Sequence, residues 1–100
     1  MKILKKLKIN GLWWDVKYDD NVSREGNCYG STHHTSQNIF LEPKLSRQKT
    51  EQTFLHEILH VVWDLQGLSQ NKKFLREDEE LLVNTLANGL YAALKDNKLI

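Results

Sequence analysis

The chain is 100 residues long, and hydrophobic residues make up 40% of it. At this length about 60–65% of the unfolded chain's surface can be buried, so we expect one modest core and a single domain spanning residues 1–100. The 14 basic and 13 acidic residues nearly cancel. This balance gives no electrostatic reason to expect nucleic acid or an anionic membrane as a partner.

The single cysteine, Cys28, cannot form an intramolecular disulfide, so the fold needs no oxidising compartment. The start MKILKKLKIN interrupts its apolar residues with lysines, unlike a signal peptide, and no later run reaches a transmembrane length. We therefore expect an intracellular, cytoplasmic protein that is monomeric or weakly oligomeric.

Two strands are expected at the start of the chain, over residues 2–9 and 12–18, where apolar and polar residues alternate. Asn10-Gly11 between them is typical of a two-residue hairpin turn. The alternation places Trp14 on the core side of the second strand. These residues predict the beginning of a small sheet.

The polar segment 19–36 is rich in Asp, Asn, Gly and Ser, and we expect it to be mostly loop, with a short strand segment as the alternative. The residues from Gln37 to Leu41 then form a short apolar strand before Pro43, which cannot donate to a ladder. We interpret this strand as a sheet edge. An extended peptide or protein substrate could pair with it by main-chain hydrogen bonds.

Two helices complete the expected fold. Ser46 is a favourable N-cap for a helix over about 47–66, and Gly67 stands where helices usually stop. A second helix over about 77–95 opens with an acidic run at the positive end of its dipole. Strands followed by helices predict an α+β domain with a small, twisted, mainly antiparallel sheet packed on the helices. The expected buried stripes are Phe54, Ile58, Val61, Val62 and Leu65, and then Val83, Leu86, Ala87, Leu90 and Leu94.

The residues His56-Glu57-Ile58-Leu59-His60 form an H-E-x-x-H pattern inside the first expected helix. Residues four apart differ by about 40° around a helix and roughly 6 Å along it, so both imidazoles can bind one zinc ion. Glu57 can then reach a water held by the metal and accept its proton as general base. A chance match on a solvated face is the alternative, but the apolar flanks indicate a buried helix, where unpaired polar groups are costly.

A catalytic zinc usually takes three protein ligands, so a third ligand is expected in the acidic run of the second helix. Glu80 is preferred, because Asn84 stands four residues later on the same face and can orient a ligating histidine. Glu77 or Glu79 is the next choice. Otherwise the remaining acidic residues of this run are expected to cap the helix and to favour solubility.

Several other side chains could in principle take part in the chemistry, but none is assigned a role. A donor that stabilises the transition state is sought among Tyr29, His33, His34 and Tyr91. Paired loop histidines are most often exposed, and Tyr91 lies about 16 Å along the helix from Glu80, which favours packing. Cys28 is interpreted as an isolated small buried thiol, and a thiol that reaches the zinc and holds the enzyme latent is the alternative. Trp63 is interpreted as a packing residue, with a substrate-pocket wall as second choice.

The stretches TFLHEILHVVW and EELLVNTLANGLY, about twenty residues apart, resemble the gluzincin clan of zinc metallopeptidases. The similarity is greatest to small ImmA/IrrE-type and phage-encoded peptidases and to the compact minigluzincins, and it covers most of the chain. It implies a zincin-like fold that hydrolyses peptide bonds, with substrate aligned on the upper sheet edge. It also implies zinc ligands at His56, His60 and Glu80, the base at Glu57 and a supporting role for Asn84.

The match to the ExxANxFA pattern of ImmA-like peptidases is imperfect, because Val83 replaces Ala and Leu86 replaces Phe. The regulatory or DNA-binding domain of larger members has no counterpart in these residues, so those regulatory roles do not carry over.

We therefore expect a zinc-dependent endopeptidase, and three alternatives stay open. The first is an inactive or latent zincin-like binding module with a structural zinc site. The second is a protease held shut by its own tail, from Asp96 to Ile100, or by segment 19–36. The third, a DNA-linked role, rests on family association alone.

Overall fold

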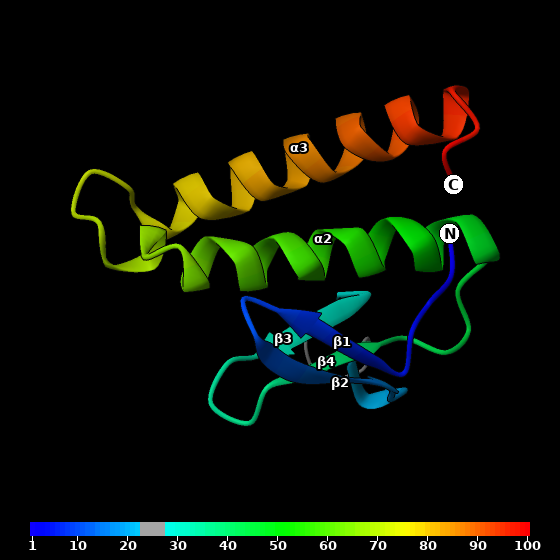
Figure 1. Ribbon diagram of the computed structural model, residues 1–100, viewed down its shortest axis with the longest axis horizontal. Helices are drawn as coiled ribbons and strands as arrows, with labels where there is room; N and C mark the ends of the chain where they lie inside the picture. The colour runs from blue at the N-terminus through cyan, green and yellow to red at the C-terminus, as the bar shows by residue number, and fades with distance from the viewer. Residues whose placement is uncertain (23–27) are drawn as a thin grey trace.

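The computed structural model of the protein describes residues 1–22 and 28–100. Figure 1 shows three layers, in which α2 lies between the sheet and α3. The α+β class expected from the sequence is confirmed. The elements are β1 (Lys6–Ile9), β2 (Leu12–Tyr18), β3 (Gly30–His33), β4 (Asn38–Leu41), α2 (Arg47–Leu65), the short 3-10 helix η1 (Leu68–Gln70) and α3 (Arg76–Asp96).

The four-stranded sheet is mixed, with the order β1-β2-β4-β3. The pairs β1–β2 and β3–β4 are antiparallel, but β2 and β4 run parallel, with Asp15 opposite Asn38. The chain leaves β2, forms β3 at the outside and returns through β4 between them. A parallel neighbour is possible here because this long connection replaces a tight turn.

The prediction that Gln37 to Leu41 forms an edge strand is wrong, because β4 pairs with a neighbour on each side. Its apolar pattern is that of a central strand, and the side chains of Ile39 and Leu41 are fully buried. The edge strands are β1 and β3, and β3 lies in the segment expected to be mostly loop. Its sequence GSTH lacks an apolar pattern because an edge strand beside a cavity need not bury its side chains. Residues 23–27 of the expected loop lie outside the described residues.

The expected hairpin at the start of the chain is confirmed, although β1 begins only at Lys6. Asn10 and Gly11 have φ angles of 51° and 79°, the positive values that a type I′ turn requires. The core forms where one face of the sheet meets α2. Its buried members are Trp14, Val16, Ile39, Leu41, Phe54 and Val61.

Both helices lie close to their expected bounds. The Ser46 side chain accepts a hydrogen bond from the Lys49 backbone N–H, and Gly67 follows α2 with a φ of 81°. No helix among the described residues is long and apolar enough to cross a membrane.

The buried stripe of α3 is narrower than predicted. Val83, Ala87 and Tyr91 are buried, whereas Leu86 is 59% and Leu90 43% exposed. The reason is visible in Figure 1, where α3 lies outside the other layers and has α2 as its main neighbour. A helix with one neighbour buries only the side chains that face it.

Glu51 in α2 is a buried carboxylate that joins three parts of the chain. It accepts a hydrogen bond of 2.6 Å from the Tyr91 hydroxyl of α3 and one of 2.9 Å from the amine of Met1. Arg47 adds a third partner at 3.3 Å. The hydrogen bonds from Tyr91 and from the terminal amine lower the pKa of Glu51 to about 2. The hydrogen bond between Tyr91 and Glu51, together with the buried side chains of Val83 and Ala87, holds α3 against α2.

We expect Tyr91→Phe to lower the free energy of unfolding by about 1–3 kcal/mol at pH 7, because a buried carboxylate loses a donor. Glu51 has a folded pKa below its usual value of 4.5, so the stability it contributes is complete above 4.5 and is lost as the pH falls toward 2. Urea denaturation of both proteins between pH 2 and 7 checks this. A difference that stays constant over that range would contradict the role of the carboxylate.

Candidate metal centre

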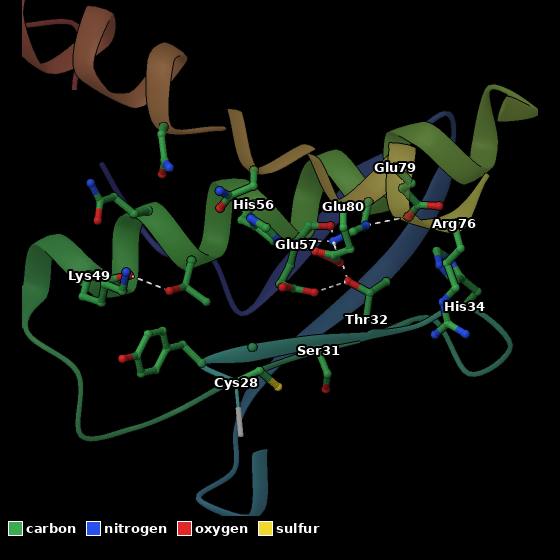
Figure 2. Close-up of a pocket in the computed structure, with 17 residues that line it drawn as sticks. Cys28, Ser31, Thr32, His34, Lys49, His56, Glu57, Arg76, Glu79 and Glu80 are labelled. Atoms are coloured by element: carbon green, nitrogen blue, oxygen red, sulfur yellow. Dashed lines mark hydrogen bonds and ion pairs between the residues drawn. The ribbon is translucent and has the colours of Figure 1, made fainter. Parts of the chain in front are cut away.

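The two histidines of the H-E-x-x-H pattern stand on successive turns of α2, and their ring centroids are 4.8 Å apart. Figure 2 shows His56 together with Glu57 and Glu80. The Nε2 atoms of His56 and His60 are 3.1 Å apart. Glu80 reaches them from α3, with Oε1 2.9 Å from Nε2 of His60 and Oε2 3.9 Å from Nε2 of His56. The structure therefore brings together the three residues that the sequence nominated as metal ligands.

The spacing of these atoms fits one small cation. The ligand atoms of His56, His60 and Glu80 all lie within 4.8 Å of one another. Two ligands about 2.0–2.1 Å from a tetrahedral zinc ion lie roughly 3.3 Å apart, close to the separation of the two imidazole nitrogens. Two imidazoles and one carboxylate form a donor set that zinc enzymes use.

Glu79 contacts the Nδ1 atom of His60, on the side of the ring away from Glu80. Its Oε2 is 2.6 Å from Nδ1 of His60, and an ionised carboxylate can only accept, so Nδ1 carries the proton. In the neutral imidazole, Nε2 then presents a lone pair toward the Glu80 carboxylate. Two acceptors at 2.9 Å need a cation or an additional proton between them. This arrangement is the donor chemistry of a metal site.

The prediction that Asn84 orients a ligating histidine is wrong, and Glu79 does so instead. Asn84 is exposed and lines the cavity one turn beyond Glu80, and among the described residues its side chain makes no hydrogen bond. Glu79 was expected to cap the N-terminus of α3 or, as an alternative to Glu80, to bind the metal. That function belongs to Asp78, whose carboxylate accepts the Leu75 N–H at 2.7 Å.

Glu57, the expected base, is only 5% exposed and lies beside the histidine pair. Its Oε1 accepts a hydrogen bond of 2.7 Å from the Thr32 hydroxyl of β3. Burial raises the pKa of Glu57, and the hydrogen bond from Thr32 opposes that rise. Burial and the neighbouring His60 lower the pKa of His56, which favours the neutral imidazole that binds metals.

The backbone of β3 approaches α2 closely at Gly30. A Cβ atom at this position would lie 2.7 Å from Cγ2 of Thr53 and 3.1 Å from Cγ of Glu57. Glycine therefore lets the edge strand lie directly against the face of α2 that carries Glu57. No pattern in the sequence signalled this contact or the hydrogen bond from Thr32, because both join segments that pair only in three dimensions.

An open cavity of about 810 Å³ surrounds these side chains, between β3 and the two helices. Cys28 lines it and is only partly buried, so the expectation of a buried thiol is wrong, and it does not belong to the group of close ligand atoms. Tyr29 and His34 also line the cavity, and His34 lies 3.4 Å from Asp64.

Three other residues weighed from the sequence lie away from the ligands. His33 packs on Phe40, with its ring centroid 4.8 Å from that of the phenylalanine. Tyr91 is buried against Glu51, as a packing residue. Trp63 is buried and contacts Phe74, and it borders a second, smaller cavity of about 420 Å³. No donor for the transition state can be assigned among them.

We expect Gly30→Ala to destabilise the protein by about 1–3 kcal/mol, because the added methyl group overpacks the contact between β3 and α2. Thermal and urea unfolding measure this loss. Gly11→Ala is not a suitable control, since its positive φ adds strain of its own. Ser31→Ala, one residue along β3, is the control and should change stability by less than about 0.5 kcal/mol. Equal losses in the two variants would contradict the close approach.

Comparisons of the chain with protein-family models, with curated proteins and with solved structures find no match. The case for a function therefore rests on the geometry of the described side chains and on the motif resemblance.

Proposed function

We propose that this protein is a zinc-dependent endopeptidase with a zincin-like, gluzincin-type site that acts in the cytoplasm. The observation that carries the proposal is the convergence of His56, His60 and Glu80 from two helices, beside the buried carboxylate of Glu57. Each of these side chains has the chemistry that the proposed role requires: imidazole or carboxylate ligands, and a base that is almost fully buried.

His56, His60 and Glu80 would hold a zinc ion, which would supply the Lewis acidity that activates water and polarises a peptide carbonyl. Glu57 would accept a proton from the attacking water, while Thr32 holds its Oε1 atom. As the new C–O bond forms and the C–N bond breaks, Glu57 returns that proton to the leaving nitrogen. The raised pKa of Glu57 suits a group that must both accept and donate near neutral pH.

The substrate strand is proposed to pair with β3 and not with β4. β3 is an edge strand whose residues Gly30, Ser31 and Thr32 line the cavity, whereas both sides of β4 are occupied by neighbouring strands. An extended peptide on this edge forms main-chain hydrogen bonds, which recognise backbone more than side chains. Its scissile bond would then lie over the ligand residues, in the cavity between β3 and the helices.

The alternative of a purely structural zinc site receives less support from the geometry. Structural zinc sites are usually closed by four protein ligands, and catalytic sites keep a position for water or substrate. The described residues place three ligands together, and they do so on an open cavity. This favours a catalytic site over a metal staple.

Metal analysis tests the ligand set. Purified protein dialysed against zinc and then buffer should retain one equivalent, whereas His56→Ala and Glu80→Gln should lose at least about tenfold in affinity. Glu79→Gln should weaken binding about 10–100-fold through the orientation of His60. Glu77→Gln is the matched control, because this exposed carboxylate lies in the same helical turn and should bind zinc as the parent does. Loss of zinc from that control alone would contradict the assignment.

Hydrolysis tests the base. Glu57→Gln keeps the size and burial of the side chain but cannot accept a proton, so cleavage of a fluorogenic peptide library should fall at least about 100-fold. Its zinc content should remain that of the parent protein. If the parent binds zinc and cleaves no peptide in the library, or if the variant cleaves equally well, the peptidase proposal is overturned and a binding role is favoured.

A further inference from the structure

A row of polar side chains on α3 lines the cavity beside the candidate ligands. Arg76, Glu80, Asn84 and Asn88 stand at successive turns of the helix, and all of them are exposed and line the cavity. Residues four apart lie about 6 Å from one another along a helix, so the row repeats at that distance. Glu80 is the candidate ligand, and its neighbours in the row are therefore placed to contact whatever approaches the metal.

Asn84 and Asn88 have no explanation within the chain itself. Asparagine is less favourable than alanine inside a helix, because its side chain competes for the backbone hydrogen bonds. Among the described residues, neither side chain forms a hydrogen bond, and neither stands at an end of α3. Two side-chain amides are thus free to bind a molecule that enters the cavity.

The cavity has two walls, and α2 is its floor. β3 forms one wall and follows α2 in the same direction. Gly30, at its start, approaches Thr53, whereas His34, just beyond its end, lies 3.4 Å from Asp64, further along α2. α3 returns in the opposite direction on the other side of α2 (Figure 1). An extended peptide that pairs with β3 therefore has the polar row of α3 on its other side.

The row on α3 matches the repeat of an extended main chain. Successive residues of such a chain turn their N–H and C=O groups to opposite edges, so the groups on one edge repeat every two residues, about 6.6 Å. This is close to the repeat of about 6 Å along the helix. A side-chain amide both donates and accepts, as a peptide group does. Asn84 and Asn88 are thus suited to contact alternate residues of one peptide edge.

We propose that Asn84 and Asn88 bind the main chain of the substrate on the edge that faces away from β3, so that the peptide is held from two sides. This role rests on the proposed function. Both asparagines lie in the same direction from Glu80, about 6 and 12 Å along α3. They therefore hold residues on one side of the scissile bond, as far as about four residues from it. The substrates are extended segments, such as tails, loops or unfolded chains.

Two zinc-binding peptides of four alanines test the proposal, because alanine side chains add little recognition of their own. One compound carries a hydroxamate at its carboxyl end, and the other carries it at its amino end through a malonyl group, so the two extend to opposite sides of the metal. Asn84→Ala and Asn88→Ala should each raise the dissociation constant of one compound about 2–10-fold, the loss of one hydrogen bond, and leave the other unchanged. Titration calorimetry measures both.

Thr85→Ala is the matched control, since Thr85 is exposed, lies about 100° around α3 from Asn84 and does not line the cavity. It should bind both compounds as the parent does. Equal losses for the two compounds, no loss for either, or a parent that binds neither would overturn the proposal. Failure of the proposed function is seen separately, as a protein that binds a hydroxamate and hydrolyses no peptide.

N-methylation of the alanines, one at a time, tests whether the asparagines contact the main chain. In the affected compound, a methyl group on a residue facing α3 should weaken binding to the parent at least about twofold more than binding to the Asn84→Ala/Asn88→Ala double variant. A methyl group on a residue facing β3 should weaken binding to both proteins equally. The same loss in both proteins at every position would contradict the proposal. Urea denaturation should show the variants at least as stable as the parent, because alanine is the better helix former.

Discussion

The contact between α2 and α3 is the constraint on which the candidate site depends. The candidate ligands come from both helices, so the distance between Glu80 and His60 depends on how closely the two helices pack. Ala87, almost fully buried, has a side chain small enough to let them approach. The hydrogen bond from Tyr91 to Glu51 secures the far end of the same contact. Rigid placement of ligands by packed helices is what a metal site requires.

The parts of the fold that local chemistry determines could be predicted from the sequence. Asn10-Gly11 specified its turn, Ser46 specified the start of α2, and helical periodicity placed His56 and His60 on one face. Sheet order could not be predicted, since it depends on which segments meet after long connections. A short apolar strand before a proline has the same sequence whether it lies at an edge or, as β4 does, in the centre.

In the candidate site, too, features fixed by one helix could be predicted, and features that depend on how elements pack together could not. Spacing along α2 was sufficient to nominate His56 and His60, because one helix presents both residues. The choice of Glu80 rested on the position of Asn84 and on the family resemblance, and the expected contact of Asn84 with a histidine does not form. The choice between Glu79 and Asn84 as the partner of His60 depends on the relative rotation of two helices, which no one-dimensional pattern records. The exposure of Leu86 was also missed, because helical periodicity identifies an apolar face but not whether another element covers it.

The proposed metal ligands and the residue that hydrogen-bonds the proposed base come from different parts of the chain. His56, His60, Glu79 and Glu80 all belong to the helical hairpin of α2 and α3, whereas Gly30 and Thr32 belong to the sheet. Metal affinity and reactivity can therefore change separately during evolution. Under the proposed function, substitutions along β3 would alter turnover or substrate choice while the helical hairpin still bound its metal ion, so hydrolysis could be lost and metal binding kept.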